Sequence, residues 1–237
     1  MIKTLVRAFL PIRLRVIISL RSRRGRLSIG RGSRIHRTTQ IFGRAHVRIG
    51  NNTSLAERTW LNVNHPSGDT PAIIIGNNCF IGRDNFFTSG KSIVIGDYCL
   101  TGIGCRFVGS THVADDPRRP IISTGTTATD IISVGSNCFF GTDATVLGHV
   151  NIGHGCVIGA RSVVTKDVPP FSVVVGSPAR VIKRFSFRRN AWISVDQLAE
   201  GDLDDNPDAQ KYSTLLRSQY PEVMLPWVAA GTEMGSF

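Results

Sequence analysis

The first 50 residues of this 237-residue chain contain no aspartate or glutamate, although they hold 13 lysines and arginines. The remaining residues carry 15 basic against 17 acidic side chains, so the net charge of +11 belongs to the amino-terminal end. Long apolar runs are also missing there, because arginines and Pro11 interrupt them and the longest clean stretch runs from Val16 to Leu20. A membrane-spanning helix needs roughly 20 apolar residues, and no small-x-small cleavage site follows a suitable apolar stretch. We therefore predict neither a membrane span nor a signal peptide.

Residues 1–24 form a basic segment in which arginines are interleaved with Ile, Leu, Val and Phe. Two interpretations stay open. The segment is a helix that caps the core of the following domain with its apolar face, or it is an amphipathic helix in peripheral contact with an anionic membrane surface. Nucleic-acid binding is not predicted, because the basic stretch has few interleaved aromatic residues and no nucleic-acid-binding motif.

Cysteine is scarce, and its spacing fits no known metal or redox pattern. The five cysteines are separated by 20, 6, 33 and 18 residues, which matches neither a zinc site nor a CxxC motif. A reducing compartment is the simplest environment for such thiols, so we expect a cytoplasmic protein. A hydrophobic content of 41% in 237 residues suits one globular domain with appendages.

The dominant feature of the sequence is a period of six residues. Aliphatic or aromatic residues recur at Val134, Phe140, Val146, Ile152, Ile158 and Val164. A residue with a small or medium-sized side chain follows each of them four positions later, at Cys138, Ala144, Val150, Cys156, Ser162 and Val168. Neither the period of a helix nor that of a strand generates this pattern. It predicts a solenoid, whose units bury their apolar faces by stacking on one another, and it places all five cysteines in the core.

The repeat and the stretch GARSVVTKDVPPFSVVVGSPARVIKRF at residues 159–185 resemble the hexapeptide-repeat acyltransferases, in particular the maltose, galactoside and nodulation-type sugar O-acetyltransferases. The resemblance implies an all-β fold, a left-handed parallel β-helix over residues 25–185 with short helical segments at both ends. Residues 186–237 form a C-terminal extension with an expected helix around 208–219, before Pro221. The extension covers the last coil or binds a partner.

The six-residue register breaks between Phe107 and Val134, where about 21 residues leave the coil. This loop carries Thr111-His112 ahead of Asp116-Pro117, which resembles the region of the catalytic histidine in the sugar acetyltransferases. The resemblance implies that His112 is the general base. An imidazole with an ordinary pKa near 6.5 is suited to take the proton of a sugar hydroxyl as that hydroxyl attacks a thioester.

The same resemblance implies acetyl-CoA as the acyl donor, without a metal, and a homotrimer with active sites between chains. The positions that match cofactor contacts in the sugar acetyltransferases are Gly141, Ala160, Thr165, Lys166 and Arg180. Small residues would let an extended pantetheine arm lie close to the backbone, and the basic side chains could meet the nucleotide phosphates. For the acceptor, the family region that holds the sugar corresponds to Asp84 and Asn85.

These residues predict transfer of acetyl from acetyl-CoA to a sugar hydroxyl, in surface-polysaccharide biosynthesis. N-acetylation of an amino sugar or an amino acid is the alternative within enzymes, and a non-catalytic β-helix scaffold is the alternative outside them. His149 and His154 lie five residues apart, but their phase does not match the histidine motif of the γ-class carbonic anhydrases, which share the implied fold. Catalytic zinc needs three converging protein ligands, so no metal site is predicted.

Overall fold

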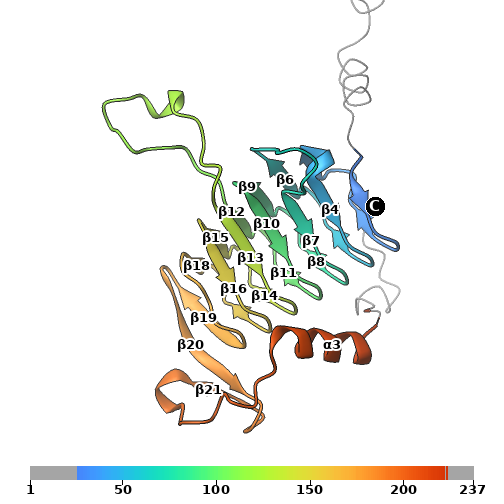
Figure 1. Cartoon of the computed structure of the whole chain (residues 1–237), viewed down its shortest axis with the longest axis vertical. Helices are drawn as coiled ribbons and strands as arrows, with labels where there is room; N and C mark the ends of the chain where they lie inside the picture. The colour runs from blue at the N-terminus through green and yellow to red at the C-terminus, as the bar shows by residue number, and fades with distance from the viewer. Residues whose placement is uncertain (1–25, 222, 224–237) are drawn as a thin grey trace, which may run out of the picture.

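Three sheets of short parallel strands wind around a common core in the computed structural model, which describes residues 26–221 and 223 (Figure 1). Each full coil gives one strand to each sheet, so that strands from successive coils lie side by side. We name the sheets A, B and C in the order in which the chain visits them, and the bends between them the AB, BC and CA corners.

The strands are as follows. Sheet A contains β1 (Ser28–Ile29), β4 (Val47–Ile49), β7 (Ile73–Ile75), β10 (Ser92–Ile95), β13 (Ile131–Val134) and β16 (Val150–Ile152). Sheet B contains β2 (Arg34–Ile35), β5 (Ser54–Leu55), β8 (Phe80–Ile81), β11 (Leu100–Thr101), β14 (Phe139–Phe140), β17 (Val157–Ile158), β19 (Ser172–Gly176), β20 (Ala179–Ser186) and β21 (Ala191–Ser194). Sheet C contains β3 (Gln40–Phe42), β6 (Trp60–Val63), β9 (Phe86–Ser89), β12 (Arg106–Val108), β15 (Thr145–Leu147) and β18 (Val163–Val164).

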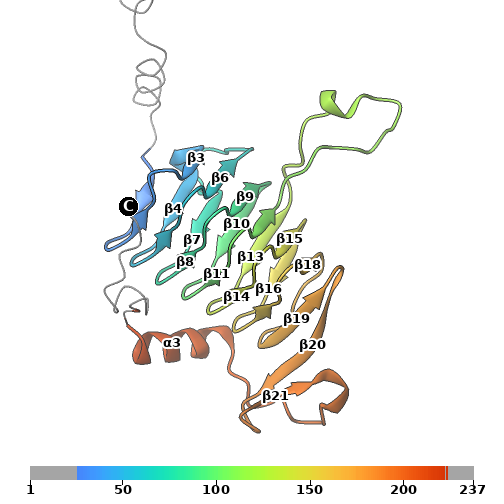
Figure 2. The same ribbon diagram turned by 180° about the vertical axis from the view of Figure 1, so that it is seen from behind.

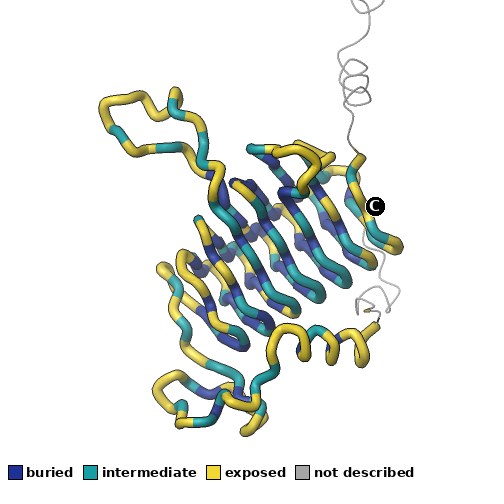
Figure 3. The backbone as a smooth tube through the Cα atoms, viewed as in Figure 1, coloured by how far each residue is buried: buried dark blue, intermediate teal, exposed yellow. Residues whose placement is uncertain are grey.

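The six-residue period of the sequence matches the buried positions of these coils. Every periodic position from Val134 to Val164 is at most 3% exposed, and the position four residues later is at most 4% exposed. Pairing aligns equivalent residues of successive coils, as in Ile95 with Val134 and Val134 with Ile152. The core is therefore a stack of equivalent side chains along the axis, and Figure 3 shows this burial concentrated along the inner side of the coils.

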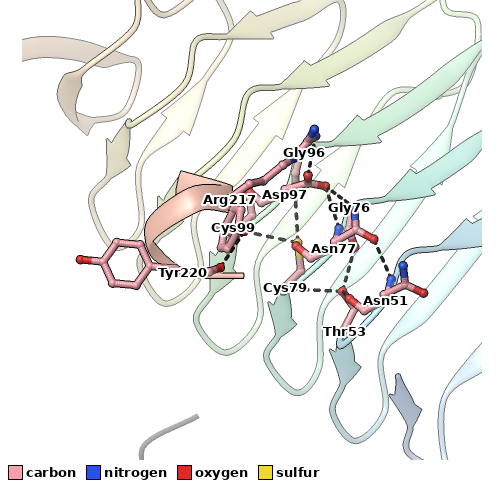
Figure 4. A network of polar contacts seen from close by, with 11 residues as sticks. Asn51, Thr53, Gly76, Asn77, Cys79, Gly96, Asp97, Cys99, Arg217 and Tyr220 are labelled. Carbon is pink, nitrogen blue, oxygen red and sulfur yellow. Dashed lines mark hydrogen bonds and ion pairs between the residues drawn. The ribbon is translucent and has the colours of Figure 1, made fainter. Parts of the chain in front are cut away.

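Corner side chains join each coil to the next at the AB corner (Figure 4). The Asn77 Oδ1 atom accepts a hydrogen bond from the Asn51 backbone N–H at 2.8 Å, and the Asp97 Oδ1 atom accepts one from the Asn77 N–H at 2.8 Å. Inside the same corner, the Cys79 thiol lies 3.2 Å from the Gly96 carbonyl oxygen. Equivalent thiol–carbonyl contacts follow at Cys99, Cys138 and Cys156. The cysteines thus pack as small buried side chains, as their register predicts.

The chain leaves the regular coils mainly at the CA corner. A 3₁₀ turn, η1 (Arg44–His46), lies at the first such corner. Residues 64–72 join β6 to β7 at the next, and residues 109–130 join β12 to β13 two coils later. Figure 1 shows the connection 109–130 projecting well away from the β-helix.

The end of the described chain returns along the AB corner. After β20 and β21, which are antiparallel to their neighbours, and a short 3₁₀ turn, η3 (Val195–Gln197), the chain forms α3 (Ala209–Gln219). The Asp208 carboxylate caps this helix by accepting a hydrogen bond from the Lys211 N–H at 2.8 Å. The helix agrees with the one expected around 208–219, and Figure 2 shows it beside several coils. The boundary expected after residue 185 falls inside β20.

The N-terminal segment 1–24, for which capping and membrane contact were both open, lies outside the described residues. Within the described part of the chain, no helix is both long enough and apolar enough to cross a membrane.

Candidate active site

The connection that carries His112 is an ordered two-stranded ribbon at its base, which we call the arm (residues 109–130). The Thr127 N–H donates to the Thr111 carbonyl at 2.8 Å, and the Val113 N–H donates to the Gly125 carbonyl at 3.1 Å. The tip contains the 3₁₀ turn η2 (Ile121–Ser123). The register break predicts a long excursion, but the pairing of its two limbs comes from contacts that the six-residue period does not encode.

His112 lies on the paired part of the arm, opposite Thr126 in an antiparallel bridge. The two backbone hydrogen bonds flank this pair, so it is the narrow, non-hydrogen-bonded type. In such pairs the Cα atoms lie about 4.5 Å apart and the two side chains stand on the same face of the ribbon. His112 is exposed, and its imidazole is therefore available to a substrate on the same face as the Thr126 hydroxyl.

At the tip of the arm, Asp116 is held by its own neighbour. Its carboxylate accepts two hydrogen bonds from the Arg118 guanidinium, both at 2.9 Å, and this contact lowers the pKa of Asp116. Both side chains are at the surface, where such pairs contribute little to stability. The Asp-Pro part of the motif therefore stabilises the conformation of the tip, whereas the paired strands at the foot of the arm position His112.

Polar side chains gather at the CA corner on the amino-terminal side of the arm. The His65 Nε2 atom is hydrogen-bonded to the Thr126 hydroxyl at 2.9 Å, which joins the connection 64–72 to the arm. The Asn64 Nδ2 atom donates to the Thr88 hydroxyl at 3.0 Å, and the Asn62 Nδ2 atom donates to the Asn64 Oδ1 atom. Thr88 is buried, whereas Asn62 and Asn64 are partly exposed and can form further hydrogen bonds. The bond between His65 and Thr126 joins this cluster to the residue opposite His112.

The five positions expected to contact the cofactor lie at two different corners. Gly141 and Ala160 stack at the BC corner, where a Cβ atom on Gly141 would lie 2.5 Å from the Ala160 backbone nitrogen. Arg180 is near them, because it pairs with Val175 in a hairpin whose Gly176 N–H bonds the Ser162 hydroxyl at 3.2 Å. Thr165 and Lys166 follow β18 at the CA corner. Sheet C therefore separates the two groups.

The two residues expected to contact the acceptor, Asp84 and Asn85, also lie at the BC corner, away from the corner that carries His112. Asn85 is 1% exposed, and its amide donates to the carbonyls of Gly82 and Gly102 at 2.8 Å each. Asp84 bonds Arg58 at 2.6 and 2.7 Å, which lowers the pKa of its carboxyl. In this chain Asn85 faces the core, and acceptor binding by either residue stays a prediction.

His149 and His154 lie at different corners. His149 is exposed at the CA corner. His154 is 7% exposed at the AB corner, where its Nε2 atom bonds the Pro207 carbonyl at 3.1 Å and its ring contacts Phe171. A pocket of about 580 Å³ lies beside His154, bounded by Asp167, Pro170 and the first residue of α3. It contains neither His112 nor the residues expected to contact the cofactor.

Sequence reasoning missed His65 and the asparagines near it. A signal was present, since Leu61 and Ile75 hold the six-residue register on either side of a 14-residue interval. The stretch NVNHP, residues 62–66, falls in that interval and is rich in side chains that form hydrogen bonds. The contact with the arm links residues 61 positions apart, and no local pattern predicts such a contact.

Known proteins share the repeat. Residues 132–166 match the family model described as bacterial transferase hexapeptide (six repeats). A Mycobacterium tuberculosis protein that carries an acetyltransferase name is 30% identical over 178 residues, which cover 75% of this chain and 55% of that protein. The serine acetyltransferase of Synechococcus elongatus is 33% identical over 136 residues, which cover 57% of this chain and 48% of the enzyme. These similarities support the hexapeptide-repeat acetyltransferase family.

The chain spans about half the length of the curated relatives it matches. Among solved structures, AntD, an N-acyltransferase from Bacillus cereus in complex with dTDP and 3-hydroxybutyryl-CoA, has a TM-score of 0.58 at 20% identity. The match covers 68% of this chain and 84% of AntD. At this identity the likeness concerns the fold. Together with the three parallel sheets, it confirms the left-handed parallel β-helix that the hexapeptide repeat predicts.

Proposed function

We propose that this protein transfers an acetyl group from acetyl-CoA to a sugar hydroxyl, with His112 as the general base. The observation that carries the proposal is the arm. It interrupts the coils at one corner, is paired at its base, and presents an exposed imidazole opposite Thr126, which His65 joins to the cluster of amides and hydroxyls.

The chemistry follows from the pKa of imidazole. A neutral His112 accepts the proton of the acceptor hydroxyl while the hydroxyl oxygen forms a bond to the thioester carbonyl carbon. The carbon–sulfur bond then breaks, and the leaving thiolate takes up that proton. A positioned general base typically contributes about 10²–10⁴-fold to such a step.

The residues expected to bind the donor suit an extended thioester in two respects. The exposed Ala160 leaves room at the BC corner for a chain that lies against the backbone. Lys166 and Arg180 are both exposed and can pair with phosphate groups. The relatives that carry acetyltransferase names, and the CoA-bound complexes of AntD, support this choice of donor.

The separation of the corners favours a homotrimer in which the site is shared. His112 projects from the CA corner, whereas Ala160 and Arg180 lie at the BC corner beyond sheet C. If a neighbouring chain placed its BC corner against the arm, one cleft would hold both parts. A closed ring of identical subunits is a usual arrangement for soluble oligomers.

The acceptor is proposed to be a saccharide, because the partly exposed amides of Asn62 and Asn64 precede His65, whose contact with Thr126 joins them to the arm that carries His112. The fold of AntD is used to acylate nitrogen, so an amino sugar is the alternative that the test must separate. We expect free thiol to be released from acetyl-CoA in the presence of hydroxyl acceptors, drawn from nucleotide sugars, oligosaccharides and lipid-linked sugars.

In the same assay we expect the His112→Ala variant to lose at least about 10²-fold in turnover while it binds acetyl-CoA as the parent does. Turnover within a few-fold of the parent would contradict the assignment of His112. Transfer to amino sugars but not to their hydroxyl counterparts would replace O-acetylation by N-acetylation and leave the role of His112 in place.

A further inference from the structure

We infer that His65 is a positioning residue for His112 and acts on it through Thr126. The inference rests on the proposed function, because it assigns His65 a part in the geometry of that site. Three residues from three separate stretches of the chain are involved: His65 contacts Thr126, and Thr126 lies opposite His112 in the ribbon.

The first link is direct. The His65 Nε2 atom and the Thr126 hydroxyl are 2.9 Å apart. Thr126 is in turn the cross-strand partner of His112 in a narrow antiparallel pair, so both side chains stand on one face of the ribbon. His65 therefore holds the same face of the arm that presents the imidazole of His112.

The second link is the anchoring of His65 itself. Its neighbour Asn64 is fixed to β9 by the bond from its amide to the Thr88 hydroxyl. The far end of the same connection is fixed by His46, whose Nδ1 atom is 3.0 Å from the Thr70 carbonyl oxygen. His46 also accepts a backbone bond, from the Ala72 N–H to its carbonyl at 2.8 Å. The connection 64–72 is thus fixed to the coils by hydrogen bonds at both ends, so it can hold the arm in place.

The arm needs such a support. It leaves the coils at Val108 and rejoins them at Ile131, and backbone hydrogen bonds tie its first and last residues to the coils, from the Gly109 N–H to the Thr88 carbonyl and from the Lys91 N–H to the Asp130 carbonyl. This attachment is the base of the arm. Rotation of the ribbon about that base would move His112 relative to the coils. Displacement of a catalytic group by about 1 Å can cost about 10²-fold in rate. The hydrogen bond from His65, whose own loop is fixed to the coils, restrains this rotation at Thr126, the residue paired with His112.

The proposal is tested first by steady-state kinetics. We expect His65→Ala and Thr126→Val each to lower kcat at least about tenfold, with KM for acetyl-CoA within about twofold of the parent. His65→Gln and Thr126→Ser keep a group that can bond at the same place, so they should recover most of the lost kcat. His149→Ala, which removes an exposed histidine from the same edge of the β-helix, is the matched control and should behave as the parent.

A second measurement does not depend on activity. Arg118 is exposed near the tip of the arm, and limited trypsin digestion cuts after arginine where the chain can move into the protease. We expect cleavage after Arg118 to be several-fold faster in His65→Ala and Thr126→Val than in the parent, in His65→Gln or in His112→Ala. Thermal unfolding of all variants shows whether a change comes from the fold as a whole.

The outcomes separate the two proposals. An inactive parent protein whose arm is cleaved faster only in His65→Ala and Thr126→Val would contradict the proposed function and keep the support of the arm by His65. Parent-like cleavage and parent-like kcat in those two variants would overturn the inference. An inactive His65→Gln with parent-like cleavage would also overturn it, because His65 would then act on the substrate itself.

Discussion

The thiols of this protein illustrate how a single residue is set by its place in the coil. Cys99 and Cys105 are at most 1% exposed, and the thiol of Cys99 lies 3.3 Å from the Gly135 carbonyl oxygen of the next coil. Burial raises the pKa of the Cys105 thiol to about 11 and raises that of Cys99 well above its usual range. At Cys99 and Cys105 the reactive thiolate form is therefore disfavoured, and burial also keeps reagents away.

This burial makes the thiols a probe of folding. We expect an aromatic disulfide reagent at pH 8 to react with the native protein far more slowly than with the unfolded chain, in which all five cysteines titrate. Rapid reaction of even one thiol per molecule of native protein would contradict the assignment of the cysteines to the core.

The glycine at position 141 shows the opposite constraint, in which a side chain does not fit. A Cβ atom at Gly141 would lie 2.5 Å from the Ala160 backbone nitrogen in the next coil. We expect Gly141→Ala to destabilise the protein by about 1–3 kcal/mol, the usual range for overpacking, as measured by urea unfolding. Gly68→Ala separates the two costs of adding a Cβ atom, since a Cβ atom there meets nothing within 4 Å but the residue has a φ of +50°, so any loss of stability comes from left-handed backbone strain, roughly 1–2 kcal/mol, and not from overpacking.

Loss of activity in Gly141→Ala would then reflect the stacking of coils and would not by itself identify a cofactor contact. Unchanged stability in Gly141→Ala would contradict the close approach of the two corners.

At the scale of elements, α3 acts as a strap along the AB corner. Tyr212 and Leu216 are buried against Phe171, and the Asn137 amide donates to the Tyr212 hydroxyl at 2.5 Å. Farther along the helix, Arg217 pairs with Asp97 at 3.1 Å. The strap therefore contacts corners from more than one coil and ties the C-terminal extension to the β-helix.

Two substitutions separate packing from hydrogen bonding in this strap. We expect Tyr212→Ala to cost about 3–5 kcal/mol, because it removes a buried ring. Tyr212→Phe keeps the ring and should cost about 1 kcal/mol, the usual net value of one hydrogen bond. Urea unfolding of both variants gives the two values, and equal losses would contradict the packing role of the ring.

Sequence predicted these elements to the extent that their causes are local. The six-residue period fixes which side chains face the core, and the helix around 208–219 has a capping aspartate directly before it. The same register places Asn85 at an inward position, four residues after Ile81, which the resemblance to sugar enzymes obscured. The pairing of the arm and the bond between His65 and Thr126 join distant residues. They depend on three-dimensional proximity that periodicity does not carry.

At the scale of the whole molecule, charge is concentrated at the amino-terminal end of the β-helix. The first two coils expose Arg31, Arg37 and Arg44, one at each of the three corners, and the rings of Phe42 and Trp60 on sheet C. Each basic residue close to an anionic bilayer contributes about 1 kcal/mol of attraction. We therefore propose that this end, with residues 1–24, makes weak and reversible contact with anionic membranes.

Liposome co-sedimentation tests this contact. The full chain should bind anionic vesicles at low salt and release them as salt is raised, and removal of residues 1–24 should weaken binding. Equal binding to neutral and anionic vesicles, or none at low salt, would favour the capping interpretation of that segment.

The outer faces of the sheets offer surfaces for assembly. On sheet B, Leu100, Phe139 and Val157 are aligned in one outward row by their strand register, and Phe139 is 40% exposed. Apolar patches of this kind commonly mark protein interfaces. We propose that this row is buried between neighbouring chains of the homotrimer.

The central claim, a catalytic site built from His112 of one chain and the BC corner of another, is tested by mixing two inactive proteins. His112→Ala lacks the base, and Ala160→Trp should obstruct the exposed corner expected to receive the donor. Each alone should release little thiol from acetyl-CoA. After co-refolding, mixed trimers should recover activity in the fraction expected for random assembly. Mixed trimers without recovered activity, or a monomeric mass by light scattering, would contradict the shared site.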